Sequence, residues 1–79
     1  MIPTILKFKE SEDLEKVKRF SRDIGMRTNI YLLDPLEYIF EGTPNMLLQL
    51  GWFIADEDLD AKPIYPESYS ILSKSENSN

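Results

Sequence analysis

The fold of this chain depends on residues 43–55, which read Thr43-Pro44-Asn45-Met46-Leu47-Leu48-Gln49-Leu50-Gly51-Trp52-Phe53-Ile54-Ala55. Thr43 followed by Pro44 is typical of a helix start, because a threonine hydroxyl can cap the first turn and proline fits its first position. In a helix, Leu48 and Trp52 would lie on a different face from four other apolar residues: Met46, Leu47, Leu50 and Ile54. Such a helix is apolar nearly all round, so it must be deeply buried or present an apolar surface.

A strand is the alternative for the same residues. Gly51 in a helix interior costs about 1 kcal/mol relative to alanine. The acids that begin at Asp56 would also lie at the end of the helix where its dipole disfavours them. As a strand, the segment would pair with residues 37–40 across a Thr-Pro-Asn turn. The sequence leaves this choice open.

The preceding residues predict a β-hairpin. Residues 28–33 and 37–40 are rich in β-branched and aromatic side chains, and Asp34-Pro35 between them is a turn signal. A competing interpretation makes Asp34 the N-cap of a short helix that begins at Pro35 and ends at Gly42. The β-branched and aromatic content favours the hairpin.

The N-terminal third predicts a strand followed by a helix. Residues 4–9 alternate apolar and polar side chains, as a half-buried strand does. Ser11 is the expected N-cap of the helix, and Gly25 is the expected left-handed residue after its end, with Met26 folding back onto the helix. The apolar stripe of this helix consists of Leu14, Val17, Phe20 and Ile24.

After residue 55 the chain predicts an acidic loop over residues 56–60, a last strand over residues 68–72 and a disordered tail over residues 74–79. With a helix at residues 43–55, the order is strand–helix–strand–strand–helix–strand. That order is typical of a ferredoxin-like α+β sandwich. The prediction is therefore a single two-layer α+β domain over residues 1–73, with a β-hairpin-rich α+β fold as the alternative.

The composition indicates a binding protein and argues against an enzyme. The 79 residues include no histidine and no cysteine, so the commonest acid–base group and the thiolate nucleophile are missing. No glycine-rich phosphate loop and no cofactor motif is present. The lack of cysteine, of a signal-peptide pattern and of a long apolar run predicts a soluble cytoplasmic protein that does not enter the membrane.

The charge is unevenly distributed along the chain. Residues 1–27 carry a net charge of +2, residues 28–79 carry −7, and the whole chain carries −5. Nucleic-acid affinity requires a basic surface that neutralises phosphates, so the acidic part argues against direct nucleic-acid binding. The separation favours a basic partner or self-association.

The acidic loop has part of the spacing of a calcium-binding loop. Asp56, Asp58, Asp60 and Glu67 fall at positions 1, 3, 5 and 12, but Ala61 stands where the sharp turn of such a loop needs glycine. We therefore expect a solvated loop and no bound metal.

The candidate binding site combines apolar side chains with neighbouring acids. Its residues are Leu48, Trp52 and Phe53 with Asp56, Glu57, Asp58 and Asp60. Tryptophan is enriched at the centres of protein interfaces, so this pattern predicts a protein-interaction or regulatory module that binds a protein partner or forms a homodimer. The alternatives are a small-molecule-sensing domain that acts as a dimer and an acidic inhibitor that mimics nucleic acid. Trp52 could also be an ordinary core residue.

Overall fold

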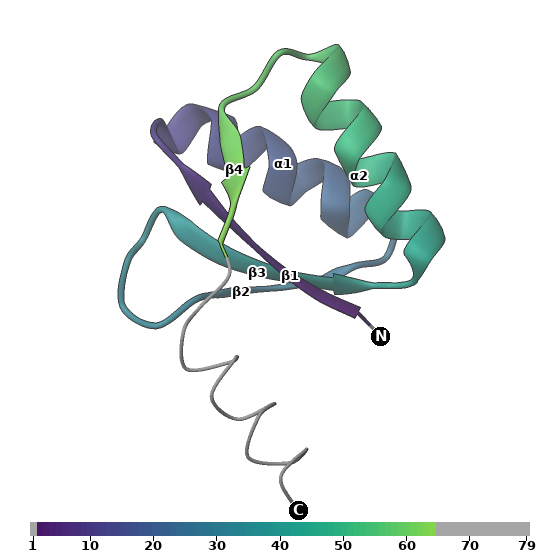
Figure 1. The fold of residues 1–79 in the computed structure, drawn as a ribbon, viewed down its shortest axis with the longest axis horizontal. Helices are drawn as coiled ribbons and strands as arrows, with labels where there is room; N and C mark the ends of the chain where they lie inside the picture. Colours follow the sequence, from purple (N-terminus) through teal and green to yellow (C-terminus); the bar gives the residue numbers. More distant parts are fainter. Residues whose placement is uncertain (1, 65–79) are drawn as a thin grey trace, which may run out of the picture.

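The strands form one antiparallel sheet, and both helices pack against the same face of it (Figure 1). The computed structural model describes residues 2–64. The elements along the chain are β1 (Ile2–Phe8), α1 (Ser11–Asp23), β2 (Arg27–Ile30), β3 (Glu37–Gly42), α2 (Pro44–Asp56) and β4 (Ala61–Pro63). The sheet order β2-β3-β1-β4 is that of a ferredoxin-like sandwich. The α+β prediction is confirmed.

Residues 43–55 form a helix with its N-cap, so the strand alternative for this segment is wrong. The Thr43 hydroxyl oxygen accepts a hydrogen bond from the Met46 backbone N–H at 3.3 Å, and Pro44 occupies the first helical position. Leu50 is almost fully buried beneath α2, whereas Gly51 is exposed in its interior. The stabilisation from the buried face therefore outweighs the unfavourable helix propensity of Gly51.

Helix α1 ends as predicted and begins differently. Gly25 has a φ of +91°, and the Met26 N–H donates to the Ser21 carbonyl at 2.9 Å, which closes the helix end. Met26 is buried, as expected. The prediction that Ser11 is the N-cap is wrong. Glu10 has the extended backbone of the cap, and its carbonyl accepts the first helical hydrogen bond, from the Leu14 N–H at 3.2 Å.

The hairpin between β2 and β3 is confirmed, and the short-helix alternative is wrong. The Asp34 side chain accepts the Leu36 N–H at 2.9 Å, which stabilises the turn, and the Tyr31 N–H donates to the Glu37 carbonyl at 2.8 Å. Strand β2 ends at Ile30, before the predicted residue 33. The next residues form the loop, in which Leu32 has a φ of +52°.

The core lies between the sheet and the two helices. Phe8 and Phe40 are almost fully buried on neighbouring central strands, and their rings meet edge to face with centroids 6.4 Å apart. The other buried apolar members of this cluster are Leu6, Leu14, Val17, Met26 and Leu50. Three of these residues come from the helices, so the core joins both layers.

Strand β4 is short and comes earlier in the chain than the predicted last strand. Ala61–Pro63 pairs with the end of β1, from Leu6 to Phe8, and the Ile64 N–H donates to the Ile5 carbonyl at 2.9 Å. The predicted strand over residues 68–72, the domain boundary at residue 73 and the tail over residues 74–79 lie outside the described residues. Within the described part, β4 leaves the first half of β1 uncovered at this edge.

Candidate functional site

The outer face of α2 exposes two large apolar side chains. Leu48 and Trp52 have 51% and 65% of their surfaces exposed, whereas Leu50 between them is only 2% exposed. Residues of an α-helix advance about 100° each, so Leu48 and Trp52 lie side by side, facing away from Leu50. We call this pair the α2 crest. Trp52 is not part of the buried core, because about two thirds of its surface is exposed.

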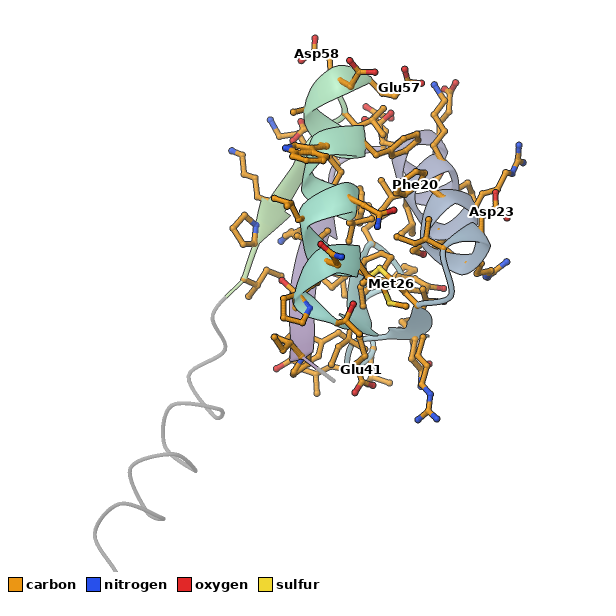
Figure 2. The ribbon with its side chains drawn as sticks, turned by 90° about the vertical axis from the view of Figure 1, so that its right-hand side faces the viewer. Phe20, Asp23, Met26, Glu41, Glu57 and Asp58 are labelled. Carbon is orange, nitrogen blue, oxygen red and sulfur yellow. The ribbon has the colours of Figure 1, made fainter. Side chains whose placement is uncertain are left out.

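A shallow, open hollow of about 620 Å³ lies on the α1 side of the crest. Phe20 of α1 and Phe53 of α2 form its aromatic part, with rings stacked at a centroid distance of 4.3 Å and an interplanar angle of 7°. Figure 2 shows Phe20 between the two helices. The remaining lining residues are Gln49, Trp52, Ala55 and Asp56. Trp52 therefore stands at the rim of a hollow that has apolar and polar walls.

A second, smaller hollow of about 290 Å³ lies on the other side of α2, against the uncovered half of β1. It is lined by Ile2, Pro3, Thr4, Leu6, Leu47, Leu50, Gly51 and Ile54. Gly51 contributes no side chain to this hollow, and a Cβ atom added there would contact no described residue outside its own helix within 4 Å. The α2 crest is thus an apolar ridge with a depression on each side.

Acidic side chains gather where α2 ends. Asp56 is the last helical residue, Glu57 is the C-cap and Asp58 turns the chain with a φ of +53°. Figure 2 shows Glu57 and Asp58 together at this end of the helix. The last turn contains no basic residue, and none of the ion pairs within residues 2–64 involves these three acids. Their charges add to the negative end of the helix dipole.

The structure brings some of the predicted site residues together and separates others. Leu48, Trp52 and Asp56 lie on one exposed face of α2, each about one helical turn after the previous one. Phe53 is half-buried, since its ring stacks on Phe20. Asp60 does not belong to this face and instead lies near the start of α1. Its carboxylate is 3.8 Å from the Lys9 ammonium, and its backbone N–H donates to the Asp13 carboxylate at 3.1 Å.

Sequence reasoning missed the residues that shape the two hollows. Phe20 belongs to the predicted apolar stripe of α1, but its partner Phe53 lies 33 positions later in the chain. Ile2 of β1 and Gly51 of α2 line the same hollow only because the fold brings these two distant elements next to each other. Contacts between segments that are distant in the chain produce no periodic pattern in the sequence, so they could not be predicted from it.

Another exposed apolar group lies at the loop between β2 and β3. Leu32 is 72% exposed and Leu33 is 93% exposed. This loop contributes nothing to either hollow beside α2. Leu33 therefore provides an apolar comparison residue outside the candidate site.

The open face of the sheet carries mainly charged and aliphatic side chains. Lys7 of β1 and Glu37 of β3 lie opposite each other and form an ion pair at 3.6 Å. Tyr38 is on the helix-covered face, where the Lys18 ammonium lies 4.7 Å from its ring centroid and 3.2 Å from its hydroxyl oxygen. Within the described strands, no aromatic side chain alternates onto the open face.

Over residues 2–64, no helix has the length and apolar character needed to cross a membrane. The same part of the chain holds no group of three side chains placed to bind a metal ion. Comparisons with protein-family models, with curated proteins and with solved structures gave no match.

Proposed function

We propose that this protein is a small interaction module that binds a protein partner through the α2 crest. The observation that carries the proposal is the position of Leu48 and Trp52 in the middle of the exposed face of α2. Single exposed apolar residues are ordinary on protein surfaces. Two large ones, one helical turn apart and flanked by hollows on both sides, are typical of a docking surface.

The free energy available from this surface is concentrated in Trp52. Burying a large apolar side chain contributes roughly 1.5–3 kcal/mol, and tryptophan is among the residues that dominate measured interface energies. A partner side chain seated in the 620 Å³ hollow would contact Trp52 together with the stacked pair of Phe20 and Phe53. Trp52 thus serves as the anchor of the interface, and the hollow beside it accommodates a side chain of the partner.

The acids at the C-terminal end of α2 make the two ends of the crest electrostatically different. Asp56, Glu57 and Asp58 make one end of the crest negative, so positive charge on a partner is favoured at that end. Such charges contribute mainly to the rate of association and to the choice of partner.

The test is affinity capture from the native host with three forms of the full chain. Wild type and Leu33→Ala should retain the same protein partner, because Leu33 lies outside the site, whereas Trp52→Ala should lose it. Circular dichroism establishes that all three forms are folded. Retention of the same partner by Trp52→Ala would contradict the proposal. Protection from thermal unfolding by a small metabolite, with no Trp52-dependent protein capture, would favour the small-molecule alternative.

A further inference from the structure

The exposed face of α2 carries large apolar side chains in its middle and an acid at its C-terminal end. Pro44, Leu48, Trp52 and Asp56 are all exposed and follow one another at intervals of four residues. If a second α2 lies antiparallel on the first, with their midpoints aligned near Leu50, Leu48 of each helix faces Trp52 of the other. The same alignment brings each Asp56 to the other helix's Pro44. This alignment therefore buries two equivalent Leu48–Trp52 contacts, as a twofold interface requires.

The charges at the two ends of α2 favour this antiparallel arrangement. The first turn of α2 contains no acid and the last turn contains no base, so neither end of the helix dipole is balanced within the helix. In an antiparallel pair, Asp56 and Glu57 of each copy approach the positive N-terminal end of the other helix. In a parallel pair, the two acidic ends would meet and repel each other. Electrostatics thus selects one orientation.

Gly51 is consistent with a closely approaching helix. It is exposed on the same side of α2 as Leu48, three residues further along. Apart from its chain neighbours and the backbone of its own helix, no atom of residues 2–64 occupies the space beside it. Glycine destabilises a helix interior relative to alanine, and no contact within the described part of the chain requires it at this position. A second α2 would place Trp52 of the other copy beside Leu48. The absence of a side chain on the neighbouring Gly51 leaves room there for the indole ring.

The size of the surface indicates a weak, reversible complex. A helix of 13 residues is about 20 Å long at 1.5 Å per residue. One such helix offers less than the roughly 800 Å² per partner of a standard stable interface. Monomer and dimer should therefore exchange as the protein concentration changes.

We infer that the partner of the α2 crest is a second copy of this chain, bound as a twofold antiparallel α2–α2 dimer. This inference rests on the proposed function, since it assigns an occupant to the same surface. The complex contains two equivalent contacts between Leu48 and Trp52. It also contains two contacts between an acidic helix end and a helix N-terminus.

The experiment is sedimentation equilibrium of the full chain at concentrations up to about 1 mM, where even a weak complex forms. The weight-average mass of wild type should rise from 9.2 kDa towards twice that value, and the emission of Trp52 should shift to the blue in parallel. Leu33→Ala should behave like wild type. Leu48→Ala and Trp52→Ala should remain at the monomer mass. Circular dichroism shows whether each variant is folded.

A matched pair of charge reversals tests the orientation. Asp56→Lys should weaken the dimer roughly tenfold, because it places a lysine at the positive end of the other helix. Asp23→Lys changes the net charge by the same amount at an exposed acid that ends α1. If only general repulsion between acidic chains mattered, both variants would strengthen the dimer.

Two outcomes would overturn the inference: a wild type that stays monomeric throughout, or Leu48→Ala and Trp52→Ala variants that dimerise as wild type does. A monomeric wild type that still captures another protein in a Trp52-dependent way would leave the proposed function standing. Loss of that capture as well would contradict both.

Discussion

Replacing Gly51 with alanine should stabilise the folded protein. Gly51 lies in the interior of α2 and is exposed. Beyond its chain neighbours and its own helix backbone, an added Cβ atom would meet no heavy atom of residues 2–64 within 4 Å. The new methyl group therefore causes no clash, and the helix gains the full difference in propensity, about 0.8–1.0 kcal/mol. For a domain of this size the midpoint of thermal unfolding should rise by about 4–8 °C.

The measurement is urea unfolding followed by circular dichroism, with Gly42→Ala as the matched comparison. At Gly42 an added Cβ atom would lie 3.0 Å from the Met46 Sδ atom and 3.1 Å from the Met26 Cε atom. Gly42 is also buried, so this substitution should overpack the core and cost roughly 1–3 kcal/mol. Two glycine-to-alanine changes in one chain should thus have opposite signs. Destabilisation by Gly51→Ala would contradict this prediction, because it would mean that the space beside Gly51 is filled in the monomer.

Three further substitutions test the cap, the core and the surface by denaturant unfolding. Thr43→Ala should cost about 1 kcal/mol, because α2 loses its N-cap hydrogen bond, and Thr43→Ser should restore most of it. Phe40→Ala should cost roughly 3–5 kcal/mol, much of the stability of so small a domain, since Phe40 is fully buried between Phe8 and Tyr38. Trp52→Ala should change the free energy of unfolding by less than about 0.5 kcal/mol; a loss of several kcal/mol would show that Trp52 belongs to the core.

The sequence predicted the elements whose local signals agree with each other. Around α1, the apolar stripe, the acids of the first turn and Gly25 all indicate the same helix, and only the N-cap was placed one residue late. The hairpin was predicted because Asp34-Pro35 separates two β-rich segments. For α2 the signals conflict, since the Thr43 cap favours a helix while Gly51 and the terminal acids oppose it. Burial of Leu50 favours the helix over the strand. This burial depends on the packing of the whole domain, so the local sequence does not reveal it.

The candidate site was predictable in part for the same reason. Helical spacing already separates Leu48 and Trp52 from the buried face of α2. Asp60 was grouped with the other acids because it is near them in sequence, but its carboxylate is paired with Lys9. The hollow beside Trp52 depends on a contact between Phe20 and Phe53, which only the packing of the two helices creates.

The proposed function requires that Trp52 is accessible in the monomer and becomes shielded in a complex. The chain contains one tryptophan, so fluorescence quenching by neutral acrylamide reports on this side chain alone. In dilute wild-type protein, the quenching constant should approach that of the same chain unfolded in urea. It should fall as the concentration is raised or when a partner is bound. A Trp52 that is already protected from acrylamide in the dilute, folded monomer would contradict the account.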